Sequence, residues 1–158
     1  MVKHLKGGFS LLEILIVIVI IGVLTSIALP YYENAVQSAR SAEAVIWWGN
    51  TKNWIAGRDI SRTHADKTEQ NANEKLKYFT LKLVCRIKDF NEICWEAEFH
   101  LKNPQQRVKY YLATQKNFLQ LVCVPENGAG DSFCQTQAGQ DKGPDTEING
   151  KPAYLIRY

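Results

Sequence analysis

The feature that most constrains this chain is an apolar run close to its start. From Phe9 to Leu29 the sequence has 21 residues and a single charged side chain, Glu13. At about 1.5 Å per residue, a helix of this length is about 30 Å long, which is enough to cross the hydrocarbon core of a bilayer. The rest of the chain mixes polar, aromatic and charged residues, as a water-soluble domain does. The sequence therefore predicts a membrane helix followed by a soluble head.

A secretory signal peptide is the simplest alternative interpretation, because it also has a basic start and an apolar middle. That interpretation needs a small-residue cleavage site behind the apolar run, and Ser26 to Ala28 offers one. Gly7 and Gly8 instead provide a flexible cleavage point ahead of the run. Cleavage there would keep the helix in the mature protein, so the glycine pair favours a retained membrane helix.

Glu13 is the second feature that a plain anchor does not explain. A carboxylate inside lipid costs about 2.5 kcal/mol or more and needs a partner. Cleavage after Gly8 would leave Phe9 with a free α-amine, the only cation that the apolar segment itself would supply. The amine of a neighbouring copy could neutralise Glu13 and thereby fix the register in which helices assemble side by side.

The segment from Lys6 to Pro30 resembles the class III signal and N-terminal helix of type IV pilins and type II secretion pseudopilins. Gly8 stands before the cut, Phe9 begins the mature chain, Glu13 is its fifth residue and Pro30 is at the helix-kink position. The resemblance implies cleavage between Gly8 and Phe9 by a prepilin peptidase, and N-methylation of Phe9. It also implies a single-pass precursor in the inner membrane, and inner-membrane machinery that assembles a homopolymer of pilin subunits outside the cell.

The expected organisation is a leader over residues 1–8, a membrane or filament-core half of the helix over 9–29, a head half over 30–57 and a globular head over 58–158. A kink or local melting is expected at Pro30, and Gly57 is expected to cap the helix. Val45, Trp48 and Ile55 are placed to pack on a sheet. A stripe of mostly small residues is also expected to pack on the head rather than on a partner: Ala35, Ala39, Ala42, Ile46 and Gly49.

The head is expected to be a sheet reached through a polar surface connection over residues 58–75. From Leu76 the apolar pattern has a period of two, which predicts four strands in an antiparallel meander over 76–124. One long helix packed on a roughly four-stranded antiparallel sheet is an α+β head, as in the type IV pilin-like fold. The remaining region, 123–158, ends in an alternating stretch around Tyr154 that could add an edge strand or pack along the head surface.

Four cysteines without a C-x-x-C pair favour disulfides over a zinc site. Cys123 and Cys134 bracket a loop rich in glycine and turn formers, whose closure would add about 2 to 3 kcal/mol. This pair resembles the C-terminal disulfide loop of type IV pilins. Cys85 would then pair with Cys94. Simple strand alternation makes that bond difficult, so it needs Cys94 in the preceding turn or at a bulge.

The sequence gives little indication of catalysis, metal binding or nucleic-acid binding. His100 lies beside Glu96 and Glu98 on the polar face of a strand, where a solvated histidine is a simpler interpretation than a Cys–His nucleophile pair. The stretch Gly128 to Asp131 is interpreted as a turn rather than as a calcium loop. The net charge of +3, with both signs interspersed, predicts no specific nucleic-acid binding. No enzyme activity, cofactor or metal is therefore expected.

Three functions fit these features. The first is a structural subunit of a type IV pilus, in which adhesion, twitching motility or DNA uptake would belong to the whole filament. The second is a type II secretion pseudopilin, which the terminal cysteine loop and the lack of a convincing calcium loop disfavour. The third is a membrane-anchored binding head that never polymerises. Such an anchor would tolerate Glu13→Leu, whereas a polymer should lose assembly.

Overall fold

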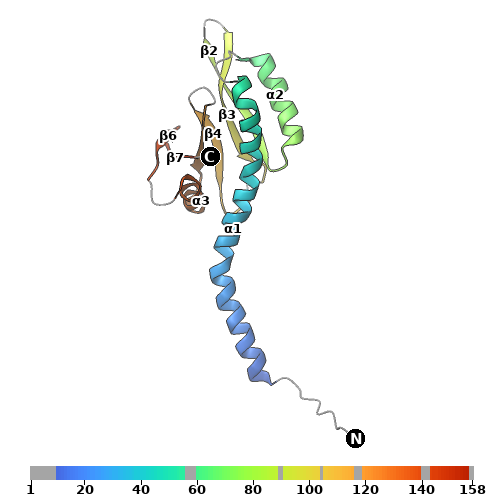
Figure 1. The fold of residues 1–158 in the computed structure, drawn as a ribbon, viewed down its shortest axis with the longest axis vertical. Coiled ribbons are helices and arrows are strands. Elements are labelled where there is room, and N and C mark those ends of the chain that lie inside the picture. Colours follow the sequence, from blue (N-terminus) through green and yellow to red (C-terminus); the bar gives the residue numbers. More distant parts are fainter. Residues whose placement is uncertain are drawn as a thin grey trace. The chain divides into compact units, whose positions relative to one another are not determined.

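The computed structural model describes residues 10–55, 60–88, 91–103, 105–115, 119–139 and 143–156. The chain divides into two compact units, one ending at Ala35 and the other beginning at Val36. In the first unit the described residues belong almost entirely to helix α1 (Leu11–Ile55), which continues into the second unit. The second unit is the head (Figure 1).

Helix α1 is helical through Pro30, so the structure does not show local melting there. Within the head, α1 turns one face inward, with Ala44, Trp48 and Ile55 buried at spacings of four and seven residues. Val45 is partly buried against the same core. The three apolar side chains expected to face the sheet therefore pack into the core of the head.

The small-residue stripe of α1 does not pack on the head. All five of its residues are exposed, and the Ile46 side chain is 63% exposed. The expectation of head packing was therefore wrong. Small residues at spacings of three and four define a helix face, but that spacing does not say which side the face is on. The observed orientation buries the large Trp48 ring, which is 9% exposed.

The described residues form seven strands, and every paired neighbour is antiparallel. They are β1 (Ile60–Ser61), β2 (Phe79–Lys88), β3 (Asn91–Leu101), β4 (Tyr110–Gln115), β5 (Gln120–Pro125), β6 (Thr146–Ile148) and β7 (Lys151–Leu155). The predicted meander corresponds to β2 through β5, and the α+β class is confirmed. Four strands was an underestimate, because β1 and β6 are too short to show a period of two. The tail forms strand β7, which pairs with β5.

Two helices of the head were not predicted. Helix α2 (Arg62–Lys75) occupies most of the stretch expected to be a surface connection. Its buried side is only Ala65 and Ala72, seven residues apart, so an apolar period was nearly invisible in the sequence. Helix α3 (Gly128–Ala138) lies in the stretch expected to be a loop of turns. Asn127 caps α3 by accepting a hydrogen bond from the backbone nitrogen of Gly130 at 2.8 Å.

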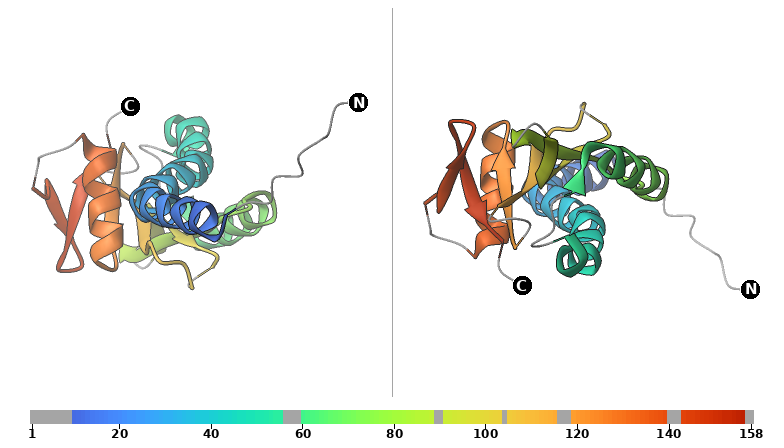
Figure 2. Two further views of the ribbon diagram at one scale, coloured as in Figure 1. Left: turned by 90° about the horizontal axis from the view of Figure 1, so that it is seen from below. Right: turned by 90° about the horizontal axis from the view of Figure 1, so that it is seen from above.

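The sheet has an apolar cluster on each face. The main core lies between the sheet and the head half of α1, with α2 and α3 on opposite sides of that helix (Figure 2). Phe79, Phe99, Tyr110 and Phe133 are its largest buried aromatic side chains. A smaller cluster on the other face contains Tyr111, Ala113, Val122, Val124 and Ala153. The helices therefore cover one face of the sheet, and the second face supplies part of the head's outer surface.

Candidate assembly segment and head surface

The assembly segment, defined here as Leu11–Leu29 of α1, is the most unusual surface of the chain. Every side chain in it is exposed, although nearly all are apolar. By length and composition, α1 is the one helix within the described ranges that could cross a membrane. Exposed apolar area of this extent marks a membrane or protein contact. The predicted membrane helix is therefore present as an uncovered apolar helix.

The hydroxyl groups of the assembly segment are satisfied within the helix itself. The Thr25 hydroxyl donates to the carbonyl oxygen of Ile21 at 2.7 Å, and the Ser26 hydroxyl donates to that of Val23 at 2.7 Å. These two side chains therefore need no external partner in an apolar surrounding, where every polar group must find one.

Glu13 differs from those hydroxyl groups because its carboxylate has no hydrogen-bond partner within the described part of the helix. It lies in the first turn of α1, where its backbone nitrogen donates to the carbonyl oxygen of Ser10 at 3.0 Å. Its carboxylate has no hydrogen-bond or ion-pair partner among residues 10–55 or elsewhere in the described chain. The positive end of the helix dipole favours a carboxylate here. Gly8 and Phe9 lie outside the described residues, so the cleavage site and the pairing of the Phe9 amine with Glu13 remain predictions.

The first disulfide joins Cys85 on β2 to Cys94 on β3. The ladder is regular up to Val84, which lies opposite Glu96, and then Cys85 lies opposite Cys94. One residue of β3 is thus skipped, which is a β-bulge. Because of the bulge, Cys94 is buried on the core side together with Ala97, three residues away. Of the two geometries considered for this bond, the structure has the bulge.

The second disulfide joins Cys123 on β5 to Cys134 on α3, and both cysteines are fully buried. The bond holds a helix against the sheet rather than closing a loop of turns. Gly128 to Asp131, weighed as a calcium loop, is the first turn of α3. The Asp131 carboxylate accepts hydrogen bonds from the Tyr154 hydroxyl at 2.6 Å and from Gln135 at 3.1 Å. Burial, together with the bond to Asp131, raises the pKa of Tyr154.

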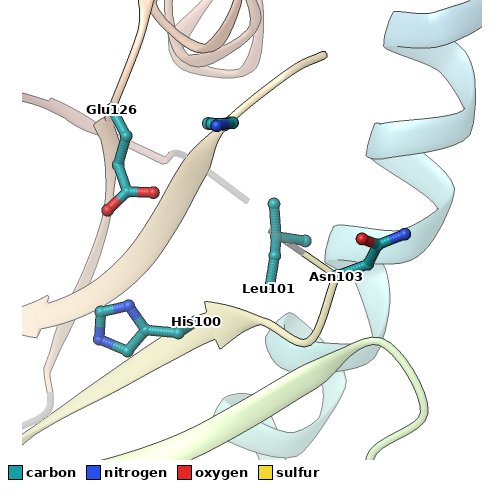
Figure 3. Close-up of a pocket in the computed structure, with 5 residues that line it drawn as sticks. His100, Leu101, Asn103 and Glu126 are labelled. Atoms are coloured by element: carbon teal, nitrogen blue, oxygen red, sulfur yellow. The ribbon is translucent and has the colours of Figure 1, made fainter. Parts of the chain in front are cut away.

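A hollow of about 270 Å³ on the head is lined by His100, Leu101, Asn103, Lys109 and Glu126. Glu126 and His100 lie on one side of it and Asn103 on the other (Figure 3). His100 Nε2 lies within hydrogen-bond distance of Glu98 Oε2, at 2.9 Å. The His100 ring also stacks on the Tyr111 ring, with 4.9 Å between the ring centroids. Because all four cysteines are bonded, no thiol is available to His100, which removes the Cys–His alternative.

Glu98 gives the head a specific acid sensitivity. The hydrogen bond with His100 lowers the pKa of Glu98, and the charges of His100 and Lys82 lower it further, against the opposing effect of burial. A carboxyl group whose pKa is lowered by folding stabilises the fold above its unfolded pKa of about 4.3, and that contribution is lost as the pH falls through the folded value. Between pH 5 and pH 3 we therefore expect the wild type to lose more unfolding free energy than Glu98→Gln does.

Urea unfolding of the full chain in detergent micelles at pH 5, 4 and 3, followed by tryptophan fluorescence, measures this difference. Glu74→Gln, at an exposed position of α2, controls for the removal of one negative charge. If the wild type and Glu98→Gln lose the same unfolding free energy between pH 5 and pH 3, the Glu98–His100 contact does not contribute to stability.

Several polar side chains that fix the head were not identified from sequence. The Glu43 carboxylate of α1 accepts hydrogen bonds from the backbone nitrogens of Lys77 at 2.5 Å and Tyr78 at 2.8 Å. Gln37 and Arg40 both donate to the side-chain oxygen of Gln106 at 2.7 Å. The partners are 34 to 69 residues apart in the chain. No local pattern in the sequence could have indicated these contacts.

Comparison with known proteins matches the beginning of the chain. The prokaryotic N-terminal methylation motif matches residues 3–29. The fimbrial protein EcpC of Eikenella corrodens is 41% identical over 56 residues, which cover 35% of this chain and 37% of that protein. A fimbrial protein of Moraxella nonliquefaciens is 39% identical over 69 residues, covering 43% and 45% of the two chains. The type IV major fimbrial protein FimA of Dichelobacter nodosus is 42% identical over 43 residues, 27% of each chain.

No solved structure matches the chain. The matched segments span less than half of each of these relatives. A methylation motif, an exposed apolar helix with one carboxylate and an antiparallel α+β head together resemble the organisation of a pilin. The chain is thus similar to proteins named fimbrial protein and type IV major fimbrial protein, and its residues 3–29 match the prokaryotic N-terminal methylation motif.

Proposed function

We propose that this chain is a structural subunit of a type IV pilus. The observation that carries the proposal is the methylation motif at residues 3–29, which overlaps an exposed apolar helix segment with a single carboxylate, Glu13. An ordinary anchor would need the apolar length but not the carboxylate. The names of the matched relatives, fimbrial protein and type IV major fimbrial protein, support the same function.

In the proposed mechanism the assembly segment lies first in the membrane and then in the filament. In the membrane its apolar side chains, which are exposed among the described residues, lie in lipid. In the filament the same side chains pack against those of other subunits. The transfer is selective because the Phe9 amine of one subunit neutralises Glu13 of the next, so only the register that pairs the two charges leaves none buried alone.

The steps before assembly follow from the same segment. A prepilin peptidase cleaves after Gly8, and Phe9 is methylated at its new N-terminus. The precursor crosses the inner membrane once, with the head on the outer side, where both disulfides can form. Inner-membrane pilus machinery then adds the subunit to an extracellular filament. The part of the head that faces outward would give the filament its surface chemistry.

Mass spectrometry of filaments sheared from the cell surface tests this function. We expect the chain to be a component of the sheared fraction, to begin at a methylated Phe9 and to contain two intact disulfides. Trypsin and reduction with differential alkylation resolve both the N-terminal peptide and the cysteine pairs. A periplasmic product that begins after Ala28 would overturn the proposal, because it would make the apolar run a removable signal.

A further inference from the structure

Among the described residues, strand β2 has one edge that pairs with no other strand. Its other edge pairs with β3 from Phe79 to Lys88. The unpaired edge is covered by α2, two of whose side chains hydrogen-bond to the backbone of β2. Backbone nitrogens and carbonyl oxygens along an uncovered strand edge readily pair with a strand of another molecule. How α2 covers this edge therefore determines whether two heads can pair through it.

Asn73 of α2 contacts the edge as a neighbouring strand would. The backbone nitrogen of Leu81 donates to Asn73 Oδ1 at 2.6 Å, and Asn73 Nδ2 donates to the carbonyl oxygen of Leu81 at 3.1 Å. A carboxamide carries the same donor and acceptor as a peptide group. One side chain thus satisfies both backbone groups that Leu81 would offer to another strand.

Glu69 covers the next position along the same edge. Its Oε1 accepts a hydrogen bond from the backbone nitrogen of Leu83 at 2.5 Å. Four residues of helix advance about 6 Å, and two residues of strand advance about 6.6 Å. The spacing from Glu69 to Asn73 therefore matches the spacing from Leu83 to Leu81, with the helix antiparallel to the strand.

Further contacts hold α2 in this position. Ala65 and Ala72 face the core and are at most 2% exposed, so small side chains allow the helix to approach closely. The Lys102 ammonium donates to the carbonyl oxygens of Asn73 and Leu76 and fixes the C-terminal end of α2. Near the other end, the Arg62 guanidinium contacts the Cys85 sulfur at 3.3 Å. The edge from Leu81 to Cys85 is thus covered by one continuous helix.

We propose that α2 is an edge cap that prevents β2 from pairing with β2 of a second copy of this chain. The edge can pair with itself because an antiparallel pair with a two-fold axis at Lys82 places Leu81 of one copy opposite Leu83 of the other. Those residues carry the backbone groups that Asn73 and Glu69 occupy. The exposed Lys82 would face Lys82 of the second copy, and like charges directly opposite each other add a second barrier. This inference concerns the head alone and does not depend on polymerisation.

The test uses the full chain in detergent micelles and the double variant Asn73→Ala/Glu69→Ala. Asn71→Ala/Glu74→Ala is the matched control, because it removes the same two residue types from exposed positions of the same helix. Amide hydrogen exchange in dilute samples is expected to be at least tenfold faster at Leu81 and Leu83 in the double variant only.

A second readout detects the pairing itself. Isotopically light and heavy chains are mixed, concentrated and treated with a short amine-reactive cross-linker. We expect a mixed light–heavy link between two Lys82 residues in the double variant and none in the control or the wild type. Association through α1 occurs in all three proteins, so only the Lys82–Lys82 link counts.

Unchanged exchange at Leu81 and Leu83 without the link overturns the proposal, as does an equal yield of the link in the control. Circular dichroism and an intact Cys85–Cys94 bond establish that the variant is folded. If the double variant does not fold, Asn73→Asp decides by the same two readouts, because it keeps the acceptor for Leu81 and places an oxygen against the Leu81 carbonyl. Slow exchange and no link in that variant would also overturn the proposal.

Discussion

Replacing Glu13 by leucine is expected to abolish surface filaments while leaving the chain in the membrane. The substitution removes a charge that costs about 2.5 kcal/mol or more in lipid, so the membrane-bound precursor should become more stable rather than less. The proposed partner of Glu13, the Phe9 amine of a neighbour, would then be buried without a counter-charge. Breaking a buried pair by removing one partner costs about 3 to 5 kcal/mol at each contact. A filament repeats this loss at every subunit.

The measurement compares sheared filaments with the membrane fraction of the same cells, by immunoblot and electron microscopy. We expect filament yield to fall at least tenfold and the amount of membrane-bound chain to stay the same. Thr25→Leu is the control, because it also replaces a polar residue of the assembly segment, but one whose hydroxyl is satisfied by the Ile21 carbonyl. Normal filaments from the Glu13→Leu variant would contradict the proposed pairing of Glu13 with the Phe9 amine.

The predictable elements of the fold are those whose buried apolar residues recur at a regular spacing in the sequence. Strands β2 and β3 alternate apolar and polar residues because one face of the sheet packs on the core, and this alternation is visible in the sequence. Trp48 and Ile55 were placed correctly for the same reason. Strands β4 and β5 are buried on both faces and appear as short apolar runs. Helix α2 was missed because only Ala65 and Ala72 mark its buried side. Its position is set by Asn73 and Glu69 bonding to β2, and polar side chains in a polar segment give no periodic signal.

The bulge at Cys94 shows where sequence reasoning reaches its limit. Strict alternation along β3 would place Cys94 and Ala97 on opposite faces, since they are three residues apart. A disulfide from Cys94 to Cys85 required either that Cys94 lie in the preceding turn or that the strand contain a bulge. The sequence could not decide between these two geometries. The tertiary structure provides the reason: Cys94 and Ala97 are both completely buried in the main core.

The assembly segment was predictable for a different reason, which is that a long apolar run is visible directly in the sequence. Its apolar length, Glu13 and the glycine pair do not depend on the fold of the head. The outward orientation of the small-residue stripe was not predictable, because spacing alone does not say which face of a helix is buried. Local sequence therefore specifies the part of the chain that acts outside the head, whereas long-range packing specifies which head surfaces remain exposed.

Removing the Cys123–Cys134 bond is expected to cause the largest loss of stability in the head. The paired variant Cys123→Ala/Cys134→Ala should lower the unfolding free energy by about 2 to 5 kcal/mol. Chain entropy alone gives similar losses for both bonds, because their cysteines are 11 and 9 residues apart in sequence. The difference lies in what else holds each pair together in the folded state.

Cys85 and Cys94 lie on β2 and β3, which remain joined by a ladder from Phe79 to Leu101 when the bond is absent. Cys123 and Cys134 join a strand to α3, a helix with two glycines in its first turn and therefore a low intrinsic helix propensity. Without the bond, α3 retains the buried Phe133 and Ala138, the contact from Asp131 to Tyr154 and the hydrogen bond from Gln137 to Ser38. We expect α3 to open separately from the rest of the head.

Urea unfolding of the full chain in micelles, combined with hydrogen exchange over Gly128–Ala138, distinguishes a local from a global effect. Cys85→Ala/Cys94→Ala is the matched control, since it removes the same atoms from the other bond. Exchange in α3 should accelerate at least tenfold in the first variant and stay near the wild-type rate in the control. If α3 stays equally protected in both variants, its remaining contacts with the head suffice, and the bond acts only on the unfolded chain. In that case the two variants should lose the same free energy, because their loops are almost equal in length.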